Sequence, residues 1–281
     1  MTLTRRQALG QLLTLPLLAS TAPRLARAQT QAFDHRHAAW TALLQRHVVL
    51  IRQGHASQLR YTGMAADRSR LQAYLGTLSA VSRPRFEGFS KAEQMAFLIN
   101  AYNAFTVELI LTRYPDLTSI KDLGSLLTSP WKKPFVALLG AKVTLDDIEQ
   151  NMLRRKGQYD DPRIHFAVNC ASIGCPMLRE EAYVAERLDA QLDQQTERFL
   201  ADSTRNRFNP ANGRLEVSKI FDWYGGDFAQ GHHGIRSLKG LLARHADVLA
   251  TAEKDREAIR QERVPVDFLD YDWHLNDVPR S

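Results

Sequence analysis

The sequence lacks several features that would assign a function directly. It has only two cysteines in 281 residues, and neither a C-x-x-C pair nor an H-x-x-x-H pair is present, so a metal site has little support. No dense block of lysine and arginine with interleaved aromatic residues occurs, which disfavours a nucleic-acid partner. Internal repeats, low-complexity tracts and Gly/Ser-rich linkers are also missing, so nothing marks a second domain.

A long hydrophobic run is missing as well. The apolar stretch 12–19 is shorter than the ~20 residues that span a membrane. It follows Arg5 and Arg6 and precedes a small-x-small sequence that ends at Ala28. We therefore expect residues 1–28 to be a twin-arginine export signal that is cleaved near Ala28, which predicts a periplasmic or otherwise exported protein. The alternative is an uncleaved amphipathic anchor.

Cleavage of this segment changes the charge of the chain. It removes four arginines and no acid, so the formal charge falls by four, from +6 to +2. The basic character therefore belongs partly to the signal. A remainder of about 250 residues is long enough for one large domain with a substantial core, and no integral membrane segment is expected after cleavage. We expect residues 29–89 to be an N-terminal helical region that forms one globular unit with residues 90–281.

Apolar residues at helical spacing predict several helices. The clearest begins with a capping box at Ser90 and Glu93, in which the serine accepts from a backbone amide and the glutamate reaches back. Pro115 stops this helix, and a similar start at Thr144 leads towards Gly157. The helices predicted from spacing cover residues 33–52, 68–81, 90–113, 180–201 and 237–250.

Strand signals are fewer. Residues 163–168 have the composition of a short buried strand, and an Asn-Gly turn that ends at Gly213 separates the two arms of a hairpin over 207–220. The C-terminal residues 264–277 are expected to form one more strand and a docked tail. The sequence therefore predicts an α+β fold, a helix-rich single domain with a small, mostly antiparallel sheet.

Two asparagines lie on an apolar face of the helix predicted over 90–113. Asn100 and Asn103 are three residues apart, so they share that face with Val107 and Ile110. Because an unpaired buried amide costs about 1–3 kcal/mol, something polar must face them. Either they brace the backbone of a neighbouring loop, or they line a site and hold a catalytic histidine or a substrate carbonyl.

The stretch "HFAVNCASIGCP", from His165 to Pro176, contains both cysteines. On a strand, His165 and Asn169 would point to the same face. Because proline suits the first turn of a helix, we expect Cys175 to occupy a cap position, where free amides and the helix dipole stabilise a thiolate. Cys175 would then be the nucleophile, with Cys170 as the fallback and His165 as the base. The imidazole would be oriented by an asparagine, which is Asn169, Asn100 or Asn103.

The cysteines have two other possible uses. A disulfide between Cys170 and Cys175 suits an oxidising compartment, and the four residues between them can turn. Metal binding by the two cysteines, His165 and a histidine of the His232-His233 pair is the third alternative, which no paired ligand spacing supports. We expect no metal site and no cofactor.

Other polar and aromatic residues have structural interpretations. Acids near a helix start complement the helix dipole, which accounts for Asp146, Asp147 and Glu149. Aromatic residues beside a hairpin are usually core, although they could also floor a groove; here they are Trp131, Trp223, Tyr224 and Phe228.

Several motifs carry a resemblance to a known family. In order along the chain they are "FLINAYNAFTVELIL", "KPF", "TLDDIEQNMLR", "IHFAVNCASIGCPML", "LEVSKIFDWYGGDF" and "YDWHLN". Together they resemble the domain of unknown function 547 family, over about two thirds of the chain. The resemblance implies a stand-alone bacterial form of a domain that elsewhere is fused to other modules, and it implies no reaction. Gly174 stands where a serine is common in the family. The matching polar and aromatic positions are Asn100, Asn103, Glu149, His165, Asn169, Cys170, Ser172, Cys175, Pro176, Trp223 and Tyr224.

These observations predict a site formed by the central helix and the stretch 165–176. The leading hypothesis is a thiol hydrolase or acyltransferase with a papain-like or transglutaminase-like fold, acting on an amide or ester of a small molecule or peptide. The alternative is a non-enzymatic binding or scaffold domain with a Cys170–Cys175 disulfide and a structural cluster of asparagines and histidine. The oligomeric state is not predicted.

Overall fold

Helix α5 (Lys91–Leu111) is the element around which the N-terminal two thirds of the fold packs. Nearly all its side chains are buried, as expected for a helix that is apolar on every face. Its start is the predicted capping box, in which the Ser90 hydroxyl accepts from the amide of Glu93 at 3.3 Å and the Glu93 carboxylate accepts from the amide of Ser90 at 2.7 Å. The predicted helix is confirmed.

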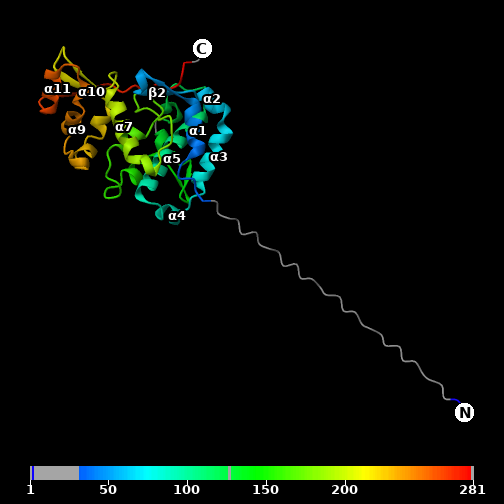
Figure 1. The fold of residues 1–281 in the computed structure, drawn as a ribbon. Coiled ribbons are helices and arrows are strands. Elements are labelled where there is room, and N and C mark those ends of the chain that lie inside the picture. Colours follow the sequence, from blue (N-terminus) through cyan, green and yellow to red (C-terminus); the bar gives the residue numbers. More distant parts are fainter. Residues whose placement is uncertain (1, 3–31, 126–127, 280–281) are drawn as a thin grey trace. The chain divides into compact units, whose positions relative to one another are not determined.

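The computed structural model describes residues 2, 32–125 and 128–279, so the expected export signal lies outside the described residues apart from Thr2. From Phe33 onward the chain forms one compact unit. It is an α+β fold in which helices predominate and the sheets are small (Figure 1). In the part of the chain that the structure describes, no helix is both long enough and apolar enough to cross a membrane.

Helix α3 (Arg68–Ser79) packs against α5 and confirms the helix predicted over 68–81. The helix predicted over 33–52 is shorter than expected, because the run Val48-Val49-Leu50-Ile51 forms a strand. Consecutive β-branched and aliphatic residues favour an extended chain, and this strand pairs antiparallel with the next. The elements are α1 (Ala38–His47), β1 (Val48–Ile51), η1 (Arg52–Gly54), β2 (Ala56–Leu59), α2 (Tyr61–Ala66), α3 (Arg68–Ser79) and α4 (Arg83–Glu87).

The segment after α5 contains short elements. The start predicted at Thr144 is confirmed, because the Thr144 hydroxyl accepts from the amide of Asp147 at 2.9 Å. The helix that follows is π-helical and ends at Leu153, before Gly157. The elements are η2 (Ile120–Leu123), η3 (Pro130–Lys132), the antiparallel pair β3 (Val136–Leu138) and β4 (Ala141–Val143), and η4 (Asp147–Leu153).

The predicted strand over 163–168 is wrong, because this stretch is the one-turn helix α6 (Ile164–Ala167). The amide of His165 donates to the carbonyl of Pro162 at 3.1 Å, and that of Val168 donates to Ile164 at 3.1 Å. All the side chains of the turn are buried, and a short, fully apolar run does not distinguish a strand from a buried helical turn. The argument that His165 and Asn169 share a strand face therefore fails.

The expected cap at Cys175 is wrong for a similar reason. Pro176 starts no helix, because the chain stays irregular until η5 (Ala185–Arg187) and α7 (Leu188–Ala201). The helix predicted over 180–201 thus begins eight residues late. Cys175 is held by the loop that surrounds it and has no helix dipole to stabilise a thiolate.

The C-terminal third confirms the hairpin and adds a parallel strand. Gly213 has φ 70° in the turn, and β5 pairs antiparallel with β6 while β7 pairs parallel with β6. The helix predicted over 237–250 divides into two at His245. The elements are β5 (Arg207–Asn209), β6 (Arg214–Val217), α8 (Ile220–Trp223), η6 (Asp227–Ala229), η7 (His232–Gly234), α9 (Leu238–Arg244), α10 (Ala246–Leu249), α11 (Glu253–Arg260) and β7 (Val266–Phe268).

The unit has two hydrophobic clusters. The larger surrounds α5, and the smaller includes residues of α8 to α11. Helices α9, α10 and α11 are on the opposite side of the unit from α3 (Figure 1). Ile164 and Ala167 belong to the larger cluster, whereas Phe166 between them belongs to the smaller. Helix α6 is therefore fixed between the two clusters, and His165 has a correspondingly fixed position.

The C-terminal tail docks against the loop that follows α6. The amide of Ile173 donates to the carbonyl of His274 at 2.8 Å, and that of Gly174 donates to Asp272 at 2.8 Å. A Cβ atom on Gly174 would lie 3.0 Å from the backbone nitrogen and oxygen of Asp272, so glycine permits this close approach. The docking brings Tyr271 and Trp273 to the site described next.

Candidate functional site

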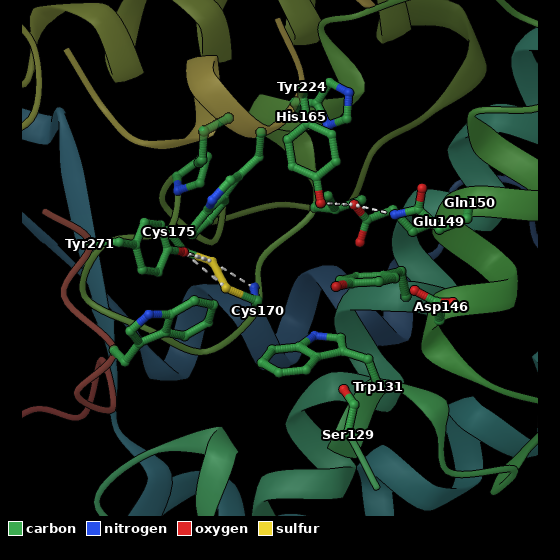
Figure 2. A pocket seen from close by; sticks show the side chains of 16 residues that line it. Ser129, Trp131, Asp146, Glu149, Gln150, His165, Cys170, Cys175, Tyr224 and Tyr271 are labelled. Atoms are coloured by element: carbon green, nitrogen blue, oxygen red, sulfur yellow. Dashed lines mark hydrogen bonds between the residues drawn. A yellow bond between two sulfur atoms is a disulfide. The ribbon is translucent and has the colours of Figure 1, made fainter. Parts of the chain in front are cut away.

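The central feature is a pocket of about 330 Å³, which we call the aromatic pocket (Figure 2). It lies between α5, η4, the loop after α6, α8 and the C-terminal tail. Volumes of this size suit small ligands. Six of the side chains that line it are aromatic, and they are Tyr102, Trp131, Trp223, Tyr224, Tyr271 and Trp273.

Four of these aromatic side chains contact one another and form a continuous surface. Ring centroids are 4.9 Å apart for Trp223 and Tyr271, 4.5 Å for Tyr271 and Trp273, and 5.8 Å for Trp131 and Trp273. Trp223 is 44% exposed, so an apolar ring faces solvent at this point. Trp131, Trp223 and Tyr224 therefore floor a groove, whereas Phe228 belongs to the smaller hydrophobic cluster.

Cys170 and Cys175 form a disulfide in the wall of this pocket. The Tyr271 hydroxyl donates to Sγ of Cys175 at 3.1 Å and lies 3.1 Å from Sγ of Cys170. The backbone amide of Cys170 also donates to Sγ of Cys175, at 2.8 Å. Only 3% of Cys175 is exposed. In this bridged state neither sulfur is a thiolate, so neither can act as a nucleophile.

His165 lines the same pocket and is paired with an acid that sequence reasoning missed. Its Nε2 lies 2.8 Å from Oδ2 of Asp227, which also accepts from Nε of Arg154 at 2.7 Å. Burial tends to raise the pKa of Asp227, but the hydrogen bonds from His165 and Arg154 outweigh it and hold that pKa well below its usual range. Among the described residues, no hydrogen bond joins His165 to either sulfur.

The ring of His165 stacks on Tyr224, with centroids 4.0 Å apart. The Tyr224 hydroxyl donates to Oε1 of Glu149 at 2.8 Å (Figure 2). Burial and the negative charge of Glu149 raise the pKa of Tyr224, and the same two causes raise that of Tyr102. Both phenols therefore stay protonated and are hydrogen-bond donors at the edge of the pocket.

Asn100 and Asn103 brace backbone, which is the first of the two roles considered for them. The amide group of Asn100 donates to the carbonyl of Tyr183 at 2.8 Å and accepts from its N–H at 3.0 Å. Asn103 donates to the carbonyl of Ala167 at 2.9 Å and accepts from the N–H of Asn169 at 2.8 Å. Both side chains are almost fully buried, and neither lines the aromatic pocket.

Asn169 holds the backbone of the disulfide loop, residues 168–176, in the same way. Its side chain donates to the carbonyl of Pro176 at 2.8 Å and accepts from the N–H of Ala171 at 2.9 Å. Ala171 has φ 62°, a left-handed conformation that persists in a residue with a side chain only where the surroundings enforce it. Buried Arg205 donates to the carbonyl of Cys175. The loop is therefore fixed from both sides.

Of the six predicted site residues, the structure brings His165, Cys170 and Cys175 to one pocket and puts the three asparagines behind it. Sequence reasoning did not select Asp227, Tyr271 or Trp273. Asp227 lies 62 residues from His165, and no periodic pattern connects positions that far apart. The only available signal was their membership of the motifs "DWYGGDF" and "YDWHLN".

His232 and His233, the histidines considered as metal ligands together with His165, lie elsewhere. Nε2 of His232 is 3.5 Å from Oδ1 of Asp161, and its ring stacks on His233 at 4.0 Å. Neither histidine lines the aromatic pocket. In residues 32–125 and 128–279, no group of three or more histidine, cysteine, aspartate or glutamate side chains is arranged to hold a metal ion.

The fold and the pocket define an α+β domain whose aromatic pocket has a disulfide in its wall. The model of the family described as "Protein of unknown function, DUF547" matches residues 86–200, and this match supports membership of that family. No curated protein and no solved structure matches the chain. The matched segment contributes Tyr102, Trp131, Glu149, His165 and both cysteines to the pocket, whereas Trp223, Tyr224, Tyr271 and Trp273 lie beyond it.

Proposed function

We propose that the protein is a binding protein for a small organic molecule, which it takes up in the aromatic pocket. The observation that carries the proposal is the pocket itself, about 330 Å³ with six aromatic side chains around it. Sites for small molecules are concave and largely apolar, with a few polar groups that orient the ligand. Here those groups are Asp146, Glu149 and Gln150 on one side and the Tyr271 hydroxyl on the other.

The state of the cysteines and asparagines supports binding over catalysis. The two sulfurs are bridged, and the amides of Asn100, Asn103 and Asn169 are satisfied by backbone. A side chain whose hydrogen bonds are all directed at the fold is a structural element. The structural alternative for this stretch of sequence is thus favoured.

Tryptophan fluorescence tests the proposal, because three of the four tryptophans line the pocket and the fourth, Trp40, is buried in the core. A panel of small organic molecules should contain members that change the emission in a saturable way. Trp223→Ala should weaken binding about tenfold without unfolding the protein, since the ring is 44% exposed. Leu50→Ala, at a similarly exposed apolar residue on β1, is the matched control. A panel in which no member binds contradicts the proposal.

A second candidate is the Cys-His hydrolase or acyltransferase, which would operate after reduction of the disulfide. One observation favours it: the amide of Cys170 and the hydroxyl of Tyr271 both donate to Sγ of Cys175. Two donors of this kind stabilise a thiolate. Cys175 would be the nucleophile, Cys170 the fallback, and His165, oriented by Asp227, the base that takes up the thiol proton.

Alkylation of the reduced protein tests this candidate. If Cys175 is an activated thiolate, iodoacetamide should modify it well below the usual thiol pKa of about 8.5. His165→Ala should then slow the reaction near neutral pH, and acyl probes should label wild type but not Cys175→Ser. A reaction that needs high pH and is indifferent to His165 would remove the candidate.

We also propose that the chain is exported by the twin-arginine route. The disulfide supports this, because such bridges persist mainly in oxidising compartments. Cell fractionation should find a mature form whose N-terminus lies near Gln29. Replacement of Arg5 and Arg6 by lysine should retain the precursor in the cytoplasm. A mature protein that starts at Met1 would rule out cleavage.

A further inference from the structure

We infer that the ligand of the aromatic pocket is an organic cation, an ammonium group carried on a small apolar body. The inference rests on the proposed binding function and adds the chemical class of the ligand. It comes from two properties of the pocket that are independent of each other. One is that its two carboxylates have no ion-pair partner among the described residues. The other is that two of its aromatic rings already bind cationic side chains of the protein itself.

Glu149 is a buried acid whose hydrogen-bond partners are neutral side chains. Only 8% of it is exposed, and Oε1 accepts from the Tyr224 hydroxyl at 2.8 Å and from Nε2 of Gln150 at 3.3 Å. Within the described part of the chain it forms no ion pair. The charge of Arg154 reaches it through space, but the guanidinium is bound to Asp227. A buried charge is costly unless it is paired, so a bound cation would supply the missing partner.

Asp146 adds a second negative charge. It lines the pocket three residues before Glu149, and its carboxylate makes no hydrogen bond or ion pair within residues 32–125 and 128–279. No lysine or arginine of the described residues lines the pocket. An anionic ligand would therefore meet two carboxylates and no lysine or arginine in the pocket wall, and a neutral ligand would leave both carboxylates without an ion-pair partner.

The aromatic faces already hold cations of the protein itself. Nζ of Lys121 lies 3.7 Å from the ring centroid of Trp273, and Cζ of Arg154 lies 4.8 Å from that of Tyr224. A cation over an aromatic face is attracted by the ring quadrupole, and several such rings around a pocket recognise ammonium groups. Lys121 is exposed and puts a positive charge beside the pocket. Removal of the Lys121 side chain should therefore strengthen the binding of a cationic ligand.

Choline and 3,3-dimethylbutan-1-ol, which has the same shape without the charge, separate this inference from simple apolar binding. In the oxidised full-length protein, we expect choline to bind at least about tenfold more tightly in a fluorescence titration. Glu149→Gln should remove most of this preference, and Lys121→Ala should strengthen choline binding. Glu186→Gln removes an exposed carboxylate outside the pocket and should change nothing.

The outcomes distinguish the two levels of the proposal. If the neutral alcohol binds as tightly as choline, the cation inference is overturned and the binding function stands. If neither compound nor any member of the wider panel binds, the binding function itself fails. Because Glu149→Gln could disturb the fold, Asp146→Asn serves as a second variant: among the described residues its carboxylate has no hydrogen bond or ion pair to lose, and the substitution should weaken choline binding with little effect on unfolding. Nα-acetyl-lysine amide, added to the panel, tests whether the cation is a peptide side chain.

Discussion

The two sides of the aromatic pocket are built in opposite ways. On one side, the disulfide loop 168–176 has its polar groups paired with backbone and its sulfurs joined. On the other, Asp146 and Glu149 carry charges without an ionic partner in the described part of the chain. The contrast teaches that the first side holds the shape of the pocket, while the second keeps the interactions that a ligand would complete (Figure 2).

The largest loss of stability is expected from substitution of Asn103, which braces the disulfide side of the pocket. Asn103→Ala removes two hydrogen bonds and leaves the carbonyl of Ala167 and the amide of Asn169 buried and unpaired. We expect a loss of about 3 kcal/mol in the free energy of unfolding, measured in urea. Asn151→Ala removes an exposed amide bonded to Asp147 and should cost under about 1 kcal/mol. Equal effects of the two substitutions would contradict the bracing role.

Removal of the disulfide is expected to have a smaller effect. The closed loop is short, so the double substitution Cys170→Ser and Cys175→Ser should lower the free energy of unfolding by about 2 kcal/mol. The asparagines remain in place to hold the loop, and ligand binding should survive at reduced affinity. Reductant should destabilise wild type by a similar amount and leave the double variant unchanged. A double variant that cannot fold would show that the bridge, rather than the asparagines, fixes this side.

The stabilisation that Asp227 contributes is expected to depend on pH. Its hydrogen bonds to His165 and Arg154 lower its pKa in the folded state, so the unfolded chain takes up a proton first as the pH falls. The stabilisation is therefore fully present well above the ordinary aspartate pKa of about 3.9, and it is lost progressively as the pH falls from there towards the lower pKa of the folded state. The difference between the urea midpoints of wild type and Asp227→Asn should be largest at pH 7 and smaller at pH 3. The control, Asp222→Asn, concerns an exposed acid on α8 and should have little effect at pH 7.

The smallest effect on stability is expected on the charged side. Asp146→Asn should change the free energy of unfolding by less than about 1 kcal/mol, because among the described residues the carboxylate makes no hydrogen bond or ion pair and interacts only with the dipole of η4. The same substitution should weaken a cationic ligand measurably. A loss of stability at Asp146 comparable to that at Asn103 would show that the two sides do not differ as described.

The sequence predicted the parts of the fold that depend on local chemistry. The capping box at Ser90, the start at Thr144 and the turn at Gly213 are each determined by a few neighbouring residues. The fold class and the family followed from the helix pattern and the motifs. The disulfide followed as an alternative from the cysteine spacing and the expected compartment.

The errors arose where tertiary contacts override local pattern. The run from Ile164 to Ala167 is apolar throughout, so periodicity could not distinguish a strand from a buried turn between two clusters. Pro176 suits a helix start, but the three asparagines and Arg205 hold the chain in another conformation. Likewise, the pairing of His165 with Asp227 joins segments 62 residues apart, and only the folded chain reveals it.

The docking of the C-terminal tail has a consequence for the order of synthesis. Tyr271 and Trp273 reach the pocket only when the tail pairs with Ile173 and Gly174, more than ninety residues after both cysteines have left the ribosome. A nascent chain can thus fold the loop 168–176 and still have no complete pocket. A ligand would bind only molecules whose translation has passed Trp273, so occupancy of the pocket would mark a finished chain.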